Sequence, residues 1–256
     1  SIVIEKLAPL LMDSKDINAL KKRNKILEEI SNLMKVKSYN ISPISRKPTF
    51  CPGCPHRDSA SNLKELTDQL INPEYMKSRG RNFLVDMIFH GDTGCYSMLK
   101  YEPFARLMQN YAGMTLGGGT GAGIDPFIKS KLNEKSLEKR IKDGLEVVNK
   151  QVVFMGDSTF YHGGRNAVSD ALKNNQDIVF IILDNKTTAM TGHQPTPGNE
   201  IDILDNPTFA QDIEREVQGM VDGVKEYKDI LLVRTNPADR KSYRNNSPVS
   251  LFLTTS

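Results

Sequence analysis

The stretch Gln151-Val152-Val153-Phe154-Met155-Gly156-Asp157-Ser158 decides the fold. Its apolar part is short and does not alternate with polar residues, which is typical of a strand that is covered on both faces. A second stretch has the same form, since the apolar run 178–183 leads into Asp184-Asn185-Lys186-Thr187. The two stretches predict neighbouring strands of a parallel sheet, with their polar loops at one edge.

Two more short apolar runs, 83–89 and 230–233, predict further strands of this sheet. Helical patterns lie between the runs, at residues 58–71, 103–111, 130–148, 164–174 and 208–222. Strands that alternate with helices are joined by right-handed crossovers. The sequence therefore predicts an α/β fold, a parallel sheet with helices on both faces.

Residues 1–48 have a different pattern. Apolar residues recur at helical spacing between Ile17 and Met34, among lysines and glutamates. A stretch rich in Ser, Pro and Asn follows, and it includes Pro43 and Pro48. We expect a helical connector or linker over residues 1–48 and one large domain over residues 49–256.

Composition limits the class of protein. Hydrophobic residues make up 38% and charged residues 25%, as in ordinary globular proteins. The net charge of +3 favours neither nucleic acid nor an anionic membrane as a partner. Three cysteines are too few, and odd in number, for a secreted disulfide framework. We expect a cytoplasmic protein that binds no nucleic acid and no membrane.

The loops after the two central strands carry ligands for a hard cation. Mg²⁺ prefers oxygen ligands, here the Asp157 carboxylate, the Asn185 amide oxygen and the Thr187 backbone carbonyl. Gly156 would let a phosphate approach the backbone, and a helix opening near residues 163–164 would favour the anion. An aspartate that only caps a helix is the alternative for Asp157.

These segments resemble a known family. Gly156-Asp157-Ser158 with the later Asn185 resembles the thiamine diphosphate motif, and residues 156–160 and 183–195 resemble indolepyruvate:ferredoxin oxidoreductase catalytic chains. The opening residues 1–11 resemble the connector of those chains. The resemblance implies the thiamine diphosphate-binding fold, with thiamine diphosphate and Mg²⁺ as cofactors. It also implies that eight further residues contact the cofactor: Gly91, Asp92, Thr93, Gly94, Ser158, Ala189, Met190 and Thr191.

The cysteines allow two interpretations. Cys51-Pro52-Gly53-Cys54 begins a segment similar to the opening of this domain in the same family, and Cys95 follows the first strand. The resemblance implies three ligands of a [4Fe-4S] cluster, whose fourth ligand is missing from this sequence. Small buried thiols beside a tight turn are the alternative.

Other polar groups are open to two readings as well. His56 and His193 are candidates for contacting the substrate carboxylate or moving protons, because imidazole titrates near neutral pH, but each could be an ordinary loop histidine. Asp92 could be a simple turn residue. The glycine-rich stretch 116–123 contains a dinucleotide-like string, but it follows no clear strand, so we expect close backbone packing there instead.

The resemblance implies oxidative decarboxylation of a 2-oxoacid of the aryl pyruvate type to an acyl-CoA, with electrons passed to ferredoxin. The chain would supply the diphosphate-binding half of the site. A pyrimidine-binding domain or subunit would supply the activating glutamate, and coenzyme A, ferredoxin and further copies in an oligomer are the other expected partners. The alternatives are a non-oxidative thiamine diphosphate-dependent decarboxylase or carboligase, and a non-catalytic subunit. The particular 2-oxoacid, and whether the chain is a separate subunit, stay open.

Overall fold

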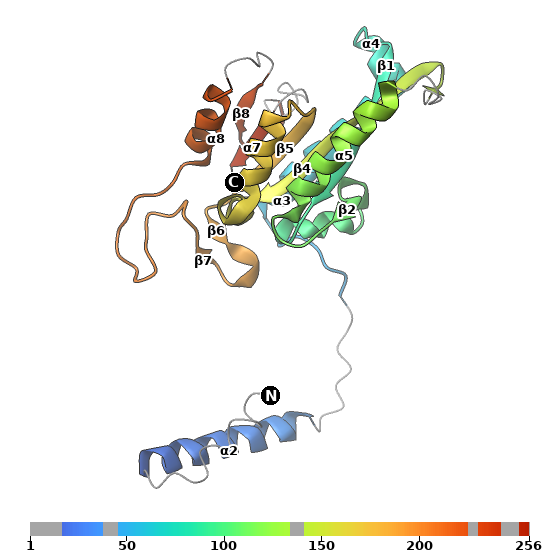
Figure 1. Ribbon diagram of the computed structural model, residues 1–256. Helices are drawn as coiled ribbons and strands as arrows, with labels where there is room; N and C mark the ends of the chain where they lie inside the picture. Colours follow the sequence, from blue (N-terminus) through green and yellow to red (C-terminus); the bar gives the residue numbers. More distant parts are fainter. Residues whose placement is uncertain (1–16, 38–45, 134–140, 225–229, 242–250, 256) are drawn as a thin grey trace. The chain divides into compact units, whose positions relative to one another are not determined.

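The computed structural model describes residues 17–37, 46–133, 141–224, 230–241 and 251–255 (Figure 1). The chain divides into two compact units, Ser1–Lys47 and Pro48–Ser256. In the first unit, the helix α2 spans Ile17–Lys37, where the spacing of apolar residues predicts one.

The second unit is built on a seven-stranded sheet in the order β2-β1-β4-β5-β9-β8, with β3 beside β4. All neighbouring pairs on this path are parallel, and β3 alone runs antiparallel to β4. The strands are β1 (Phe83–Gly91), β2 (Asn110–Tyr111), β3 (Ile141–Lys142), β4 (Leu145–Gly156), β5 (Ile178–Asp184), β8 (Leu232–Thr235) and β9 (Leu251–Thr255). A separate antiparallel pair joins β6 (Thr187–Thr188) to β7 (Gln194–Pro195).

Helices cover the sheet on both faces (Figure 1). The α-helices of this unit are α3 (Pro55–Leu70), α4 (Pro73–Ser78), α5 (Leu116–Asn133), α6 (Asp157–Thr159), α7 (Arg165–Lys173) and α8 (Ile213–Asp222). The shorter turns are η2 (Cys95–Lys100), η3 (Ala105–Leu107), η5 (Ala189–Thr191) and the π-helical η4 (Phe160–Gly164).

The central strand β4 is buried on both faces, which explains why its sequence is continuously apolar. Val152 and Phe154 pack into one buried cluster, which includes residues of α3 and α4. Val153 and Met155 pack into a second cluster, with residues of α7 and α8. Because alternate side chains enter different cores, every position of the run is apolar. The predicted α/β class is confirmed.

Two of the predicted helices are wrong. Of the predicted helix 130–148, residues 130–133 belong to α5, residues 134–140 lie outside the described residues, and the strands β3 and β4 begin at Ile141 and Leu145. Asp143 and Gly144 both have positive φ, 51° and 76°, as a two-residue hairpin turn requires. The predicted helix 103–111 is instead the short turn η3 followed by the edge strand β2.

The glycine-rich stretch 116–123 belongs to α5, which the sequence did not predict because glycine disfavours helices. Its glycines allow close packing. A Cβ on Gly121 would lie 2.6 Å from Cγ2 of Val153, and one on Gly117 would lie 2.7 Å from the Gly91 carbonyl carbon. The helix therefore lies almost directly on β1 and β4. The strand β9, between β5 and β8, was also not predicted.

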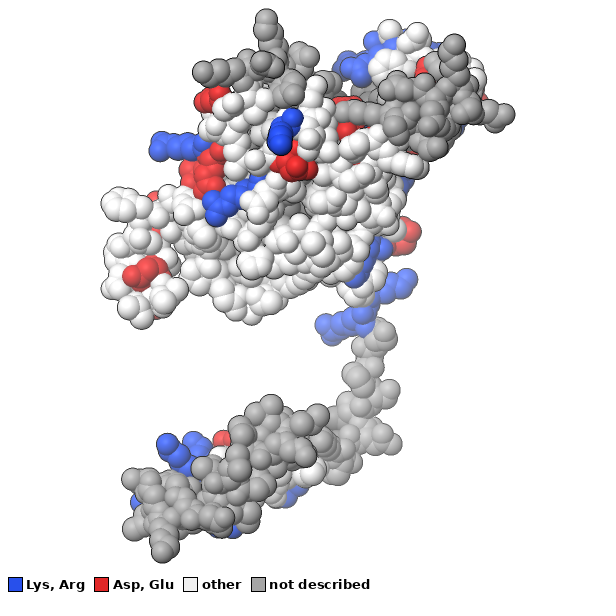
Figure 2. All heavy atoms as spheres, viewed as in Figure 1, with Lys and Arg blue, Asp and Glu red and all other residues white. Residues whose placement is uncertain are grey.

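On the face that Figure 2 shows, the basic and acidic side chains of the described residues lie in small groups among uncharged atoms. Within the described residues, no helix is both long enough and apolar enough to cross a bilayer.

Candidate functional site

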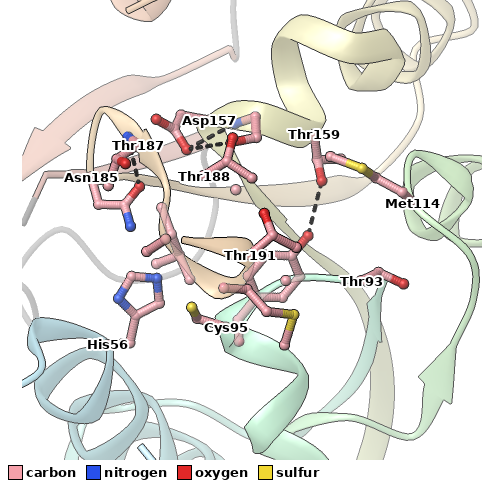
Figure 3. A pocket seen from close by; sticks show the side chains of 17 residues that line it. His56, Thr93, Cys95, Met114, Asp157, Thr159, Asn185, Thr187, Thr188 and Thr191 are labelled. Atoms are coloured by element: carbon pink, nitrogen blue, oxygen red, sulfur yellow. Dashed lines mark hydrogen bonds between the residues drawn. The ribbon is translucent and has the colours of Figure 1, made fainter. Parts of the chain in front are cut away.

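A pocket lies at the carboxyl ends of β1, β4 and β5, where the loops of a parallel sheet gather (Figure 3). The loops after β4 and β5 begin at the same level of the sheet, because Gly156 at the end of β4 pairs with Leu183 near the end of β5. The lining residues come from α3, from the ends of these strands and the loops that follow them, and from the segment between β2 and α5. They are His56, Thr93, Gly94, Cys95, Tyr96, Met114, Gly156, Asp157, Ser158, Thr159, Leu183, Asn185, Thr187, Thr188, Ala189, Met190 and Thr191.

Asp157 is a nearly buried carboxylate at the start of α6, with 2% of its surface exposed. Its Oδ1 accepts a hydrogen bond from the Ser158 backbone N–H at 2.8 Å, and the Thr196 hydroxyl donates to Oδ2 at 3.5 Å. Burial raises the pKa of Asp157 to about 6, and the negative charge of Asp184 contributes to the rise. A cation beside Asp157 would therefore relieve an unfavourable buried charge.

The chain becomes helical directly at Asp157, through α6, η4 and α7. The predicted helix start near residues 163–164 agrees with α7, which begins at Arg165 with Gly164 as its N-cap. Gly163 forms a kink before α7, with φ 178° and ψ −8°. The short turns α6 and η4, which start at the Gly156-Asp157-Ser158 loop, were not predicted.

Asn185 lies in a tight turn after β5. The Asn185 side-chain oxygen accepts from the Thr187 N–H at 3.3 Å, and the Asp184 carboxylate accepts from the Lys186 N–H at the same distance. Lys186 has a φ of 56°, so the chain reverses sharply here. The turn is tied to the Asp157 loop, because the hydroxyls of Ser158 and Thr188 lie 2.7 Å apart. Asp157 and Asn185 thus line the same pocket (Figure 3).

Asp92 follows β1 directly but does not line the pocket, and its side chain is fully buried. Burial raises its pKa, whereas hydrogen bonds from Tyr96, Thr115, Thr159 and Gly117 oppose that rise. Its neighbours Thr93 and Gly94 do line the pocket. Of the four residues of this loop that the resemblance implies, Thr93 and Gly94 line the pocket, whereas Gly91 and Asp92 do not.

His56 enters the pocket from the first turn of α3 (Figure 3). Within the described part of the chain its imidazole has no hydrogen-bond partner, and burial lowers its pKa, so the ring is neutral at pH 7. His193 differs, since it is exposed, has a φ of 60° and does not line the pocket. The structure therefore brings only one of the two predicted histidines to the site.

The three cysteines lie near one another at the N-terminal end of α3. Cys54 precedes α3, Cys95 begins η2, and the pKa of the Cys95 thiol is raised by burial and then by the neighbouring Cys54 and Cys51. Only Cys95 lines the pocket. Among the described residues, no group of three or more His, Cys, Asp or Glu side chains has the arrangement of a metal site. The thiols therefore do not form a ready-made ligand set in this structure.

Most of the predicted site residues lie in the pocket. Those that do not line it are Gly91, Asp92, His193, Cys51 and Cys54. Sequence reasoning missed five lining residues, Tyr96, Met114, Thr159, Leu183 and Thr188. All of these except Met114 stand inside or directly beside a motif that was recognised; Met114 precedes a helix that was not predicted, so no signal pointed to it.

Comparison with known proteins places the chain in a family. Residues 92–227, more than half of the chain, match the model described as thiamine pyrophosphate enzyme, C-terminal TPP binding domain. The chain is 34% identical over 170 residues to the indolepyruvate oxidoreductase subunit IorA of Methanothermobacter marburgensis, covering 66% of this chain and 22% of that protein. It is 30% identical over 203 residues to the IorA subunit of Methanothermobacter thermautotrophicus, covering 79% and 28%.

Among solved structures, the chain resembles the 2-oxoglutarate:ferredoxin oxidoreductase of Magnetococcus marinus. The TM-score is 0.55 and the sequence identity 13%, over 85% of this chain and 67% of the other. At that identity the likeness supports the fold alone. The chain spans about a quarter of the length of the curated relatives.

The sequence relatives confirm the resemblance that was predicted from the motifs. This chain belongs to the family of C-terminal TPP-binding domains of thiamine pyrophosphate enzymes.

Proposed function

We propose that this chain holds the diphosphate of thiamine diphosphate through Mg²⁺, as one half of the active site of a 2-oxoacid:ferredoxin oxidoreductase. The observation that carries the proposal is that one pocket is lined by both Asp157 and Asn185, which follow the adjacent strands β4 and β5. Two oxygen-bearing side chains at this edge of a parallel sheet suit a hard cation that bridges to phosphates.

The donor set fits the proposed ion. Asp157 offers a carboxylate whose charge is poorly compensated, since its pKa is raised to about 6 by burial and by Asp184. Asn185 offers an amide oxygen held by the turn that contains Thr187, whose backbone carbonyl is the third proposed ligand. Carboxylate, amide and carbonyl oxygens are the ligands that Mg²⁺ takes in proteins, and phosphate oxygens complete its shell.

Bound thiamine diphosphate supplies the carbanion chemistry that decarboxylates a 2-oxoacid. The protein's own contribution is to bind, orient and exclude water. Ser158 and Thr188 hold the two loops together by their hydroxyls, so the metal ligands are fixed before the cofactor arrives. His56, neutral and without a partner in the described chain, is the proposed group for contacting the substrate carboxylate or accepting a proton.

The site needs a partner. The residues that line the described pocket include Asp157 as their only carboxylate and no glutamate. We therefore assign the glutamate that activates the aminopyrimidine ring to a separate domain or subunit. The fraction of the relatives' length that this chain spans, 22% and 28%, supports this assignment.

The oxidative reaction is supported by the cysteines and by the relatives. Cys95 lines the pocket, and Cys51 and Cys54 lie near it. The three thiols are not arranged as a metal site among the described residues; a [4Fe-4S] cluster would take them as three ligands, with a fourth from outside the chain, and would supply one-electron chemistry towards ferredoxin. The relatives are named as subunits of indolepyruvate oxidoreductases, which supports an aryl pyruvate as substrate. Coenzyme A is the proposed acyl acceptor. The apolar Met114, Leu183 and Met190 along the pocket suit such a substrate.

A reconstitution assay tests this function. The chain is mixed anaerobically with a pyrimidine-binding subunit of a related oxidoreductase, thiamine diphosphate, Mg²⁺, coenzyme A and a viologen dye. We expect dye reduction and acyl-CoA with indolepyruvate or phenylpyruvate only when both proteins are present. Release of an aldehyde without dye reduction would instead identify a non-oxidative decarboxylase, and turnover by this chain alone would contradict the shared site.

A further inference from the structure

The buried acid Asp92 is linked by hydrogen bonds to both walls of the pocket, although it does not line the pocket itself. It follows the last residue of β1 and is fully buried. Its carboxylate accepts hydrogen bonds from two backbone amides and two hydroxyls, which come from η2, from the start of α5 and from α6. A buried carboxylate with several donors is a strong local constraint, because each donor would be costly to leave unpaired.

One side of this network fixes the start of α5. The Thr115 N–H donates to Oδ2 of Asp92 at 2.9 Å, and the Gly117 N–H also donates to the carboxylate. Thr115 is β-branched, yet its φ is 75°, a conformation that persists only where the surroundings enforce it. The residue before it, Met114, lines the pocket. Asp92 therefore holds one wall of the pocket in a strained geometry.

The other side of the network reaches the diphosphate loop. The Tyr96 hydroxyl donates to Oδ1 of Asp92 and lies 3.1 Å from the Thr159 hydroxyl, and it accepts from the backbone N–H of Gly156. The Thr159 hydroxyl also donates to Asp92 at 3.3 Å. Tyr96 thus joins Asp92 to both ends of Gly156-Asp157-Ser158-Thr159.

The ring of Tyr96 is packed closely against the backbone of two glycines. A Cβ on Gly94 would lie 2.4 Å from a ring carbon of Tyr96, and a Cβ on Gly156 would lie 3.3 Å from the same atom. These two glycines therefore let the chain close around the ring. Removing the hydroxyl alone would leave this packing in place, which makes Tyr96→Phe an informative variant.

We propose that Asp92 and Tyr96 are positioning residues that couple the Gly156–Thr159 loop to the start of α5, and so set the geometry in which the diphosphate is held. This inference rests on the proposed function, but the coupling is a property of the chain itself. Asp92 does not line the pocket, whereas Tyr96 does, so amide exchange in the chain without cofactor, rather than affinity alone, separates positioning from direct contact. Asp92 acts through Tyr96 on Gly156, and through Thr115 on Met114.

The first arm of the test measures amide hydrogen exchange in the chain without cofactor. Tyr96→Phe removes the acceptor of the Gly156 amide, so exchange at Gly156 should rise about tenfold or more, with little change in the core of β4. Asp92→Asn keeps the volume of the side chain but replaces one acceptor oxygen by a donor. It should speed exchange at Thr115 and Gly117.

The second arm measures affinity for thiamine diphosphate with saturating Mg²⁺ by calorimetry. Tyr96→Phe should bind about tenfold more weakly, as loss of a fixed geometry predicts. The matched control is Tyr161→Phe, which also removes one hydroxyl from a buried tyrosine but breaks a bond to the Gln211 carbonyl instead. The control should bind with unchanged affinity and show unchanged exchange at Gly156.

The two arms separate the possible failures. If the native chain binds the cofactor and Tyr96→Phe binds equally well with native exchange at Gly156, the coupling is wrong. If both tyrosine variants weaken binding equally, the effect is a general loss of packing, and the coupling is wrong as well. If the native chain does not bind thiamine diphosphate, the proposed function fails, and the exchange at Gly156, Thr115 and Gly117 still decides the coupling.

Discussion

The ionised carboxylate of Asp157 is unfavourable in the folded chain without ligand, because it is buried, and a bound cation would compensate its charge. The folded-state pKa of about 6 lies above the ordinary aspartate value of 3.8, so the folded chain binds this proton more tightly than the unfolded chain does. The ionised carboxylate therefore lowers stability above about pH 6, and the cost fades as the pH falls towards 3.8. A site that carries such a cost without its ligand is typical of a functional position.

Asp157→Asn should accordingly stabilise the chain at pH 8 in the absence of magnesium, by about 1 to 3 kcal/mol. The gain should shrink at pH 5, where the native carboxyl is largely protonated. Urea unfolding at the two pH values measures both effects. A loss of stability at pH 8 would show that the carboxylate is well compensated in the folded chain, contrary to this account.

His56 should make stability depend on pH in the opposite direction. Burial lowers its folded-state pKa below 6.5, so below pH 6.5 the unfolded chain takes up a proton that the folded chain resists. Stability from this residue is thus lost as the pH falls from 6.5, by at most about 1.4 kcal/mol per pH unit. The unfolding free energy of His56→Gln, compared with that of the native chain from pH 7.5 to 5.5, should shift in favour of the variant. A constant difference would mean that folding leaves the pKa of the imidazole unchanged, contrary to this account.

At the scale of elements, α5 depends on glycines that the sequence alone did not identify as helical. Gly117→Ala would place a Cβ 2.7 Å from the Gly91 carbonyl carbon, and Gly121→Ala would place one 2.6 Å from Val153. Overpacking of this kind costs about 1 to 3 kcal/mol. Gly119 is the internal control, because a Cβ there meets nothing within 4 Å.

Thermal unfolding of the three alanine variants separates these positions. Gly117→Ala and Gly121→Ala should melt below the native chain, whereas Gly119→Ala should gain about 0.5 to 1 kcal/mol from helix propensity. Equal melting temperatures for all three variants would show that α5 does not lie as close to β1 and β4 as described.

The elements that the sequence predicted are those whose signal is local. The two strands that flank the site, 151–155 and 178–183, could be recognised because apolar runs buried on both faces leave a clear pattern. The helix α5 and the hairpin at Asp143-Gly144 could not, because close helix–sheet packing and a primed turn override local propensity. The strand β9 pairs with β8, which precedes it in the chain, and with β5, which is distant in sequence.

Part of the candidate site, like part of the fold, could be predicted from the sequence. Asp157 and Asn185 follow predicted strands, so the parallel topology alone brings their loops to one edge. The proposed role of Tyr96 was not predictable, because it depends on the contact of its hydroxyl with Thr159, which is distant in sequence. The cysteine cluster, the domain boundary at residue 48 and the magnesium ligands stay predictions.

At the scale of the whole molecule, the chain carries one half of the proposed active site. The chain spans 22% and 28% of two relatives, and the pocket carries one carboxylate among its described lining residues. In the proposed function, binding of the diphosphate is the step that this chain performs with its own residues, whereas decarboxylation needs the partner. The central claim concerns that binding step.

Calorimetric titration of the chain with thiamine diphosphate, with and without Mg²⁺, tests the claim most directly. We predict saturable binding to the native chain only when Mg²⁺ is present, and loss of that binding in Asp157→Ala while the variant keeps its fold. Binding of unchanged affinity in Asp157→Ala, or equal affinity with and without Mg²⁺, would contradict it.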